Sequence, residues 1–276
     1  MEHIIKTLLL TTMTLFCFST HSYDWESGKW EKILSKNGIE VLSKKEKDSA
    51  LLAFRAKGLI KTPIEQMIAV LHDFDNAATW NKNLTIKKAI KTVSPLDITS
   101  YSLHGMPWPL KDREMVLRNQ LKLDLEKEVI IVEARTVEVK DAPKNKKAIE
   151  AIVKYGVFTF KPVSDTETYV ELFAHIDPKG TLPSWVFNLL QQTYPYNYLK
   201  EIEHQANSKH FVLDKQIQEK VNQLKAHMKA QDPKRKVAQK SKSQTSTDSS
   251  PIKNDNSVAA KDKKDYEKEF KLPYAK

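Results

Sequence analysis

The stretch His104-Gly-Met-Pro-Trp-Pro-Leu-Lys-Asp-Arg-Glu-Met-Val-Leu-Arg118 is the most informative part of this sequence. Two prolines flank Trp108 and make the turn rigid, because each proline fixes its own backbone φ angle. The acid–base pair Asp112-Arg113 follows, and then apolar and polar residues alternate. Such alternation is typical of a β-strand with one buried face. The stretch therefore predicts a rigid turn that leads into a strand, with Asp112 and Arg113 at its start.

A second motif follows some seventy residues later, Ile176-Asp-Pro-Lys-Gly-Thr-Leu-Pro-Ser-Trp-Val-Phe-Asn188, and it opens the last helical region. In this order and spacing, the two motifs resemble the START family of lipid-transfer domains. The resemblance extends from about Trp25 to Gln205, and with the leader described below it points to an exported, bacterial START-like protein. It implies a lipid-binding cavity and no chemistry.

Periodicity predicts an α+β chain. The expected helices are Trp25–Lys36, a helix that begins at Thr62–Glu65, and Leu182–Met228 with a kink at Pro195. The expected strands are a pair near 39–43 and 51–59, and six more near 84–93, 98–105, 113–124, 128–139, 149–161 and 167–177. This order agrees with the helix-grip fold that the resemblance implies, in which a curved antiparallel sheet wraps around a long C-terminal helix.

Composition divides the chain into three parts. Residues 1–22 have an apolar run of signal-peptide length, Thr7–Phe18, with a plausible cleavage site before Tyr23. This leader predicts export to the periplasm or out of the cell, although an uncleaved N-terminal anchor is the alternative. Residues 23–230 form the START-like domain, and residues 231–276 are polar and basic enough to predict a disordered tail.

The composition argues against several classes of function. The net charge is +10, but residues 232–276 alone contribute +5, so the excess is weak support for nucleic-acid binding and we expect none. The single cysteine, Cys17, lies in the leader, and the six glycines form no phosphate-binding loop. No histidine pair has helical metal-binding spacing. We therefore expect no metal, no cofactor and no catalytic residue.

Asn119 interrupts the apolar face of the strand that begins at Arg113. A buried amide costs about 1–3 kcal/mol unless it is paired. Asn119 is therefore either a structural amide that bonds a loop backbone or a polar contact for a lipid head group. Sterol-type START members have an arginine at the position six residues after the motif arginine, so this departure leaves the ligand class open between a lipid and a sterol-like molecule.

The other candidates also have two interpretations. Arg113 either pins a loop or touches ligand, and Trp108 lies either in the core or at the cavity entrance. From the sequence pattern alone, the aromatic residues of the last helical region belong to the core. The resemblance to the START architecture implies instead that this helix covers the cavity. The candidate lipid contacts are His104, Met106, Trp108, Arg113, Leu117, Asn119, Trp185, Leu189 and Tyr196.

The sequence thus predicts non-covalent binding, and transfer, of one lipid or other apolar molecule, with transient contact to a membrane surface. The alternative is a helix-grip enzyme, a cyclase or hydrolase that acts on an apolar molecule. That enzyme needs two titratable groups that converge in the cavity, for which His104, Glu133 and His175 are the inward candidates. A third alternative is an interaction module whose own side chains fill the cavity.

Overall fold

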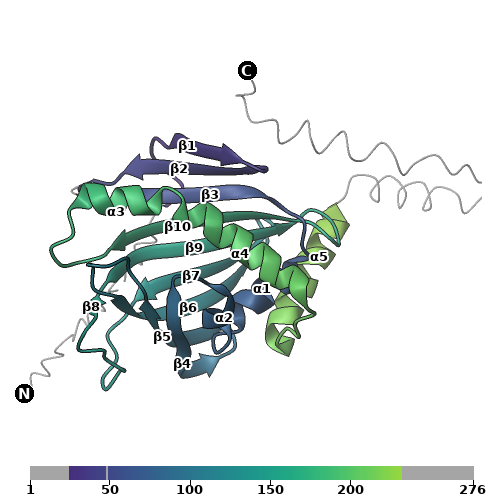
Figure 1. Cartoon of the computed structure of the whole chain (residues 1–276). Helices are drawn as coiled ribbons and strands as arrows, with labels where there is room; N and C mark the ends of the chain where they lie inside the picture. The colour runs from purple at the N-terminus through teal and green to yellow at the C-terminus, as the bar shows by residue number, and fades with distance from the viewer. Residues whose placement is uncertain (1–24, 48, 232–276) are drawn as a thin grey trace, which may run out of the picture. The chain divides into compact units, whose positions relative to one another are not determined.

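Ten strands form a single sheet in this protein, shown in Figure 1 as a computed structural model that describes residues 25–47 and 49–231. The strands are β1 (Glu31–Lys36), β2 (Ile39–Lys45), β3 (Leu52–Ile60), β4 (Leu84–Ser94), β5 (Asp97–His104), β6 (Arg113–Asp124), β7 (Val129–Thr136), β8 (Ile149–Glu150), β9 (Ile152–Pro162) and β10 (Thr168–Asp177). They follow the order β1-β2-β3-β10-β9-β7-β6-β5-β4 and pair antiparallel, except that the short β8 runs parallel to β6. The expected leader and the tail from residue 232 lie outside the described residues.

In the described part of the chain, five helices accompany the sheet: α1 (Ile64–His72), α2 (Ala77–Trp80), α3 (Ser184–Gln191), α4 (Tyr194–Ser208) and α5 (Lys215–Gln231). Figure 1 shows α3 and α4 crossing one face of the sheet, with α1 and α2 on the same side. An antiparallel sheet with a C-terminal helix across one face is the predicted α+β helix-grip arrangement, which is therefore confirmed.

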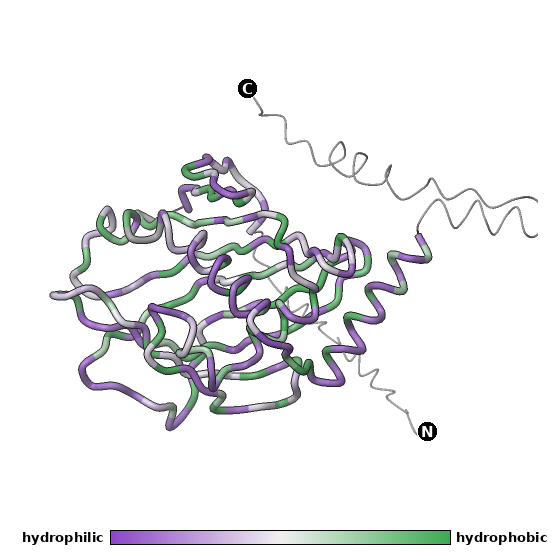
Figure 2. The backbone as a smooth tube through the Cα atoms, turned by 45° about the vertical axis from the view of Figure 1, so that its right-hand side comes forward, coloured by the Kyte–Doolittle hydropathy of each residue, from purple (hydrophilic) through white to green (hydrophobic). Residues whose placement is uncertain are grey.

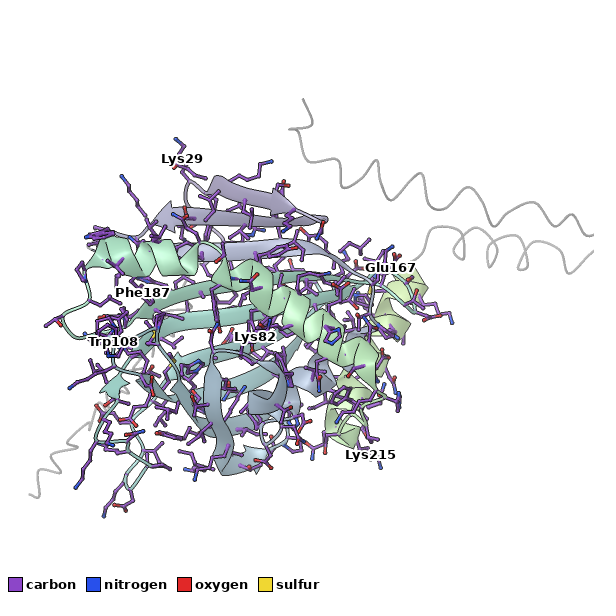
Figure 3. All side chains as sticks on the ribbon, viewed as in Figure 1. Lys29, Lys82, Trp108, Glu167, Phe187 and Lys215 are labelled. Atoms are coloured by element: carbon purple, nitrogen blue, oxygen red, sulfur yellow. The ribbon has the colours of Figure 1, made fainter. Side chains whose placement is uncertain are left out.

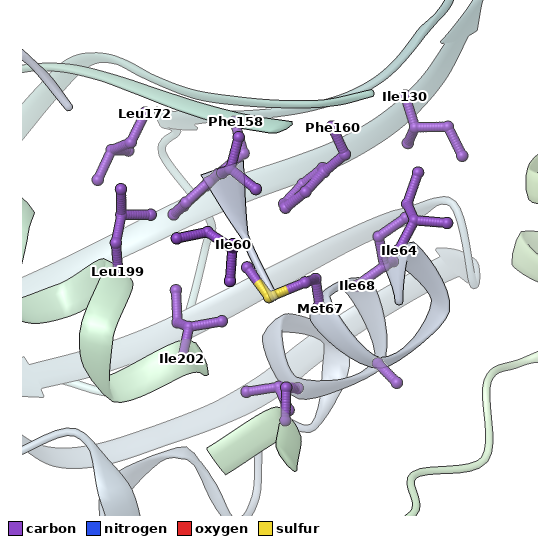
Figure 4. Packing of buried hydrophobic residues seen from close by; sticks show 14 of the residues in the cluster. Ile60, Ile64, Met67, Ile68, Ile130, Phe158, Phe160, Leu172, Leu199 and Ile202 are labelled. Carbon is purple, nitrogen blue, oxygen red and sulfur yellow. The ribbon is translucent and has the colours of Figure 1, made fainter. Parts of the chain in front are cut away.

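The main core lies between this face and the helices. Figure 4 shows Phe158, Phe160 and Leu172 of the sheet facing α1 and α4. On the helix side, Met67 and Ile202 are completely or almost completely buried. Each such side chain contributes about 1.5–3 kcal/mol through the apolar surface it removes from water. This packing fixes α1 and α4 against one half of the sheet.

The predicted helix at Trp25–Lys36 is wrong. Its second half is strand β1, which pairs with β2 at the edge of the sheet. Its first half covers the opposite face of the sheet, where Trp30 packs edge-on against Phe173 with ring centroids 6.0 Å apart. The weak helical spacing of this segment loses to strand pairing and to burial of the two tryptophans.

The prediction of one long helix over Leu182–Met228 is also wrong, because three helices occupy this region. Pro195 lies in the first turn of α4, where its missing N–H costs nothing. A second break separates α4 from α5, and the Gln66 side chain holds it by accepting from Phe211 N (2.8 Å) and donating to Phe211 O (3.0 Å). Figure 2 shows apolar and polar residues alternating along α5, and Ile217, Val221 and Leu224 are its buried positions.

Candidate functional site

A cavity of about 350 Å³ lies between the sheet and the helices. The cavity exists because a row of small residues, paired in register across the sheet, does not fill the space between the sheet and the helices. Asn119 pairs with Ala134, Ala134 with Gly156, and Gly156 with Ala174, and all four residues line the cavity. The volume is at the lower end of the range for ligand sites, about 300–1,000 Å³. The site is therefore large enough for a small ligand or a single apolar chain.

Most of the cavity wall is apolar. The sheet contributes Met115, Leu117, Leu121 and Phe158, and the helices contribute Phe187, Tyr194 and Tyr198. Tyr198 is at the centre of an aromatic cluster, stacked on Tyr194 at 5.6 Å and on Trp80 at 6.2 Å between ring centroids. Such a wall favours a hydrocarbon or ring system over a polar substrate.

Asn119 lies on this wall and is partly satisfied by its own neighbourhood. Its Nδ2 amide donates to Ile98 O (3.1 Å), Ser100 Oγ (3.0 Å) and Leu117 O (3.0 Å). Among the described residues, none donates to its Oδ1 oxygen. The amide therefore bonds strand backbone, whereas the structural alternative assumed a loop, and its carbonyl oxygen keeps the capacity to accept a hydrogen bond.

Arg113 closes one side of the cavity. It is 4% exposed, and its guanidinium donates to three backbone carbonyls, those of Lys111, Pro178 and Lys179. The last two belong to the loop between β10 and α3. On the other side of the motif, Met106 N donates to Asp112 Oδ1 at 3.1 Å. The acid–base pair thus pins two loops, in agreement with the loop-pinning interpretation of Arg113.

Two titratable groups share another part of the wall. Lys87 of β4 and His104 of β5 both line the cavity. Burial lowers the pKa of Lys87 to about 8. Burial, with a smaller effect from the charge of Lys87, lowers the pKa of His104 to about 4. At neutral pH the imidazole is therefore neutral and the ammonium still carries most of its charge.

The structure places five of the nine predicted contacts on the cavity wall: His104, Met106, Arg113, Leu117 and Asn119. Three others lie outside this wall, and for Trp108 this excludes the core but not the cavity entrance. Trp108 is 93% exposed, Trp185 is 70% exposed and Leu189 is 57% exposed, so none of these side chains faces the cavity. Tyr196 is buried in the main core instead, where Asn37 Nδ2 donates to its hydroxyl at 2.9 Å.

The sequence reading missed the residues that take these places. Phe187 of α3 and Tyr194 and Tyr198 of α4 line the cavity. The two tyrosines were missed because the break before α4 changes the phase between the two helices. Lys87 was missed because β4 does not alternate regularly. Of the three titratable candidates, His104 lines the cavity, whereas Glu133 pairs with Lys122 (2.5 Å) at the surface and His175 contacts Tyr155.

We expect Lys87→Met to stabilise the ligand-free protein at pH 7. The lowered pKa means that the folded state disfavours the ammonium, at a cost of up to about 3 kcal/mol. Between pH 8 and 10.5 the unfolded chain binds more protons at this residue, so the wild type recovers stability as pH rises. The stability difference between Lys87→Met and the wild type should therefore shrink as pH rises. Urea unfolding of the two delipidated proteins at pH 7, 8.5 and 10 measures this difference.

Other cavity groups leave this comparison interpretable. Burial raises the pKa of Tyr194 to about 12 and raises that of Tyr198 further, so both phenols stay neutral through the window. His104 is already neutral and Arg113 stays charged. His72, also on the wall, is present in both proteins. A stability difference that is independent of pH would contradict the assignment to Lys87.

Among the described residues, no helix has the length and apolar character needed to span a bilayer.

The fold is similar to that of solved structures. A STAR-related lipid transfer protein from Xanthomonas axonopodis aligns with a TM-score of 0.58 at 22% identity, over 65% of this chain and 99% of that chain. Among curated proteins, START domain-containing protein 10 from Mus musculus is 28% identical over 168 residues. That match covers 59% of this chain but only 56% of the mouse protein.

The rat phosphatidylcholine transfer protein is 22% identical over 178 residues, which are 63% of this chain and 81% of the relative. The START domain family model matches residues 21–210, well over half of the chain. This match includes both sequence motifs, the whole sheet and the helices that face the cavity. The chain therefore belongs to the START domain family.

Proposed function

We propose that this protein binds one lipid molecule in the cavity and carries it between membranes without converting it chemically. The observation that carries the proposal is the 350 Å³ cavity, whose wall is mostly apolar and includes a few polar groups, such as Lys87 of β4, His104 of β5 and Asn119 of β6. An apolar wall buries a chain or ring system, and a small number of polar groups fixes its orientation. The names of the relatives, a phosphatidylcholine transfer protein among them, support the same class of ligand.

Native mass spectrometry of the purified protein tests this proposal. We expect an adduct with the mass of one lipid, which organic extraction releases in unmodified form. When the protein is incubated with that lipid, the mass of the lipid should stay unchanged. A helix-grip enzyme would convert the lipid and change its mass, whereas a carrier would not. An adduct-free protein that also takes up no lipid from vesicles would favour an interaction module instead.

We further propose that the cavity opens toward a membrane at the exposed tryptophans. Trp108 lies on the turn whose Met106 and Pro107 line the cavity, and Trp185 lies on α3 beside Phe187. Figure 3 shows Trp108 and Phe187 at the same side of the protein. Tryptophan is favoured at membrane interfaces because one part of its ring system is apolar and its N–H is polar.

The double variant Trp108→Ser/Trp185→Ser should therefore bind lipid vesicles at least about tenfold more weakly, as expected when two interfacial aromatic side chains are lost. Vesicle co-sedimentation measures the binding. The matched control is Val212→Ser, which removes an equally exposed apolar side chain (90%) from the loop between α4 and α5. Equal losses in the two proteins would place the contact elsewhere.

Export is a separate proposal, supported by the apolar run at Thr7–Phe18. N-terminal sequencing of the mature protein should begin at or near Tyr23. A mature chain that retains Met1 would overturn it.

A further inference from the structure

Lys87 is the cation that the cavity presents to a ligand. Its side chain is half-buried, and its Nζ lies 4.5 Å from the centre of the Phe74 ring. Within the described part of the chain, its ammonium forms no ion pair with a carboxylate. The residues that line the cavity there include no Asp or Glu at all.

The backbone of β4 explains why this lysine points inward. Leu84 pairs with His104, but Ile86 pairs with Leu103, so one extra residue is inserted at Thr85. Such a bulge moves the side chains that follow it, up to the next irregularity, to the other face of the strand. Lys87 consequently pairs with Ser102 of β5, which also lines the cavity, whereas Ile86 and Lys88 are exposed.

The neighbours of Lys87 suit an anionic oxygen. Ser102 pairs with Lys87 across the two strands, and its Oγ lies 3.1 Å from His104 Nε2. The charge of Lys87 also contributes to the lowered pKa of His104, so a hydroxyl and a neutral imidazole lie near the ammonium. One of these two groups donates to the other, so the pair keeps one N–H or O–H that is able to donate to a ligand. The other strong donor on the wall is already engaged, because Arg113 donates to three backbone carbonyls. Lys87 is therefore the charged donor left for a ligand on the described wall.

Burial of an unpaired ammonium is costly, and an anionic partner recovers that cost. The lowered pKa of Lys87 is consistent with a site that lacks its counter-ion. The geometry joins this cation to an apolar wall, which begins with Met115 beside Ser102 across the β5–β6 pair. An amphiphile with a negatively charged head fits both parts.

We propose, resting on the proposed function, that Lys87 binds the anionic head group of the lipid and makes the protein selective for acidic amphiphiles. The head group is a carboxylate or a phosphate, since both present oxyanions to an ammonium. The donor that the Ser102–His104 pair keeps free orients it, and the apolar part lies along the small-residue row.

Competition binding with single-chain probes that share one palmitoyl group tests this selectivity. The probes are palmitate, 1-palmitoyl-lysophosphatidate, and the neutral 1-palmitoylglycerol. We expect at least one acidic probe to bind the wild type about tenfold or more tightly than the neutral one, as a charge-assisted hydrogen bond allows. The comparison of the two acidic probes distinguishes a carboxylate ligand from a phosphate ligand.

Three variants isolate the role of the charge. Lys87→Met should lose the preference for acidic probes. Its affinity for 1-palmitoylglycerol should change less than about threefold, which corresponds to a change in binding free energy of about RT. Lys87→Arg should keep the preference. Lys88→Met, at the exposed neighbouring position, should bind like the wild type.

The outcomes separate the two proposals. If the wild type binds the neutral probe as tightly as both acidic ones, or if Lys87→Met keeps the acidic preference, the assignment of Lys87 is wrong and lipid binding stands. If the folded wild type binds none of the three probes and no lipid from vesicles, the proposed function fails, and the assignment fails with it.

Discussion

Replacing Ala134 with tryptophan should nearly abolish lipid occupancy. Ala134 is in the middle of the row of small residues that leaves the cavity open, between Asn119 and Gly156. An indole side chain at this position fills the space that a hydrocarbon chain needs. We expect the lipid recovered from the purified protein to fall about tenfold or more, while any overpacking costs about 1–3 kcal/mol. Native mass spectrometry and thermal unfolding measure the two quantities on the same sample.

Leu189→Trp is the matched control, because it introduces the same side chain at a position that is 57% exposed on α3. We expect this variant to keep its lipid. Occupancy that is unchanged in Ala134→Trp, or reduced equally in both variants, would contradict the location of the ligand along the small-residue row.

Replacing Arg113 with methionine should cause the largest loss of stability. Three backbone carbonyls would lose a charged donor in a buried place, and two of them hold the loop between β10 and α3. Hydrogen bonds to charged groups contribute about 1.5–3 kcal/mol each, and unpaired buried carbonyls add a desolvation cost. We expect a loss of at least about 3 kcal/mol, which lowers the melting temperature of a domain of this size by about 6–12 °C.

Arg118→Met provides the comparison on the same strand. Arg118 forms a bidentate ion pair with Asp97 (Nε–Oδ1 2.9 Å, Nη2–Oδ2 2.5 Å), but its side chain is 38% exposed, so we expect its loss to cost about 1 kcal/mol, less than the loss of Arg113. Circular dichroism melts of both variants measure the difference. Equal melting temperatures would show that the loop does not depend on Arg113.

Regular alternation made much of the sheet predictable. Met115, Leu117, Asn119 and Leu121 occupy every second position of β6, and all but Asn119 are apolar, so the strand and its inward face followed from the sequence. The rigid turn and the acid–base pair also predicted where β6 begins. These signals are local, because each depends on residues that lie within one strand or one turn.

The features that the sequence did not reveal depend on partners far along the chain. Nothing within Trp25–Lys36 shows that its tryptophans will cover the outer face of the sheet, on which Phe173 lies. The prediction of which residues of the last helices face the cavity was also wrong, because the break before Tyr194 shifts the helical phase of every later residue. Tyr196 was thus placed in the cavity, although it lies in the core.

Lys87 shows the same limit within a single strand. Reading every second residue from Leu84 leads to Ile86 and Lys88, and both are exposed in the structure. The bulge at Thr85 is defined only by pairing with β5, so the sequence of β4 alone does not reveal it.

The irregularity of β4 has a consequence for solubility. This strand is at one end of the sheet, so one of its sides has no neighbour among the described strands. An edge strand readily pairs with a strand of another molecule, and an irregular backbone and exposed lysines discourage such pairing. Register shifts occur at three places along β4, and its Lys88 and Lys91 are exposed. The distortion that turns one lysine toward the cavity therefore also protects the border of the sheet from aggregation.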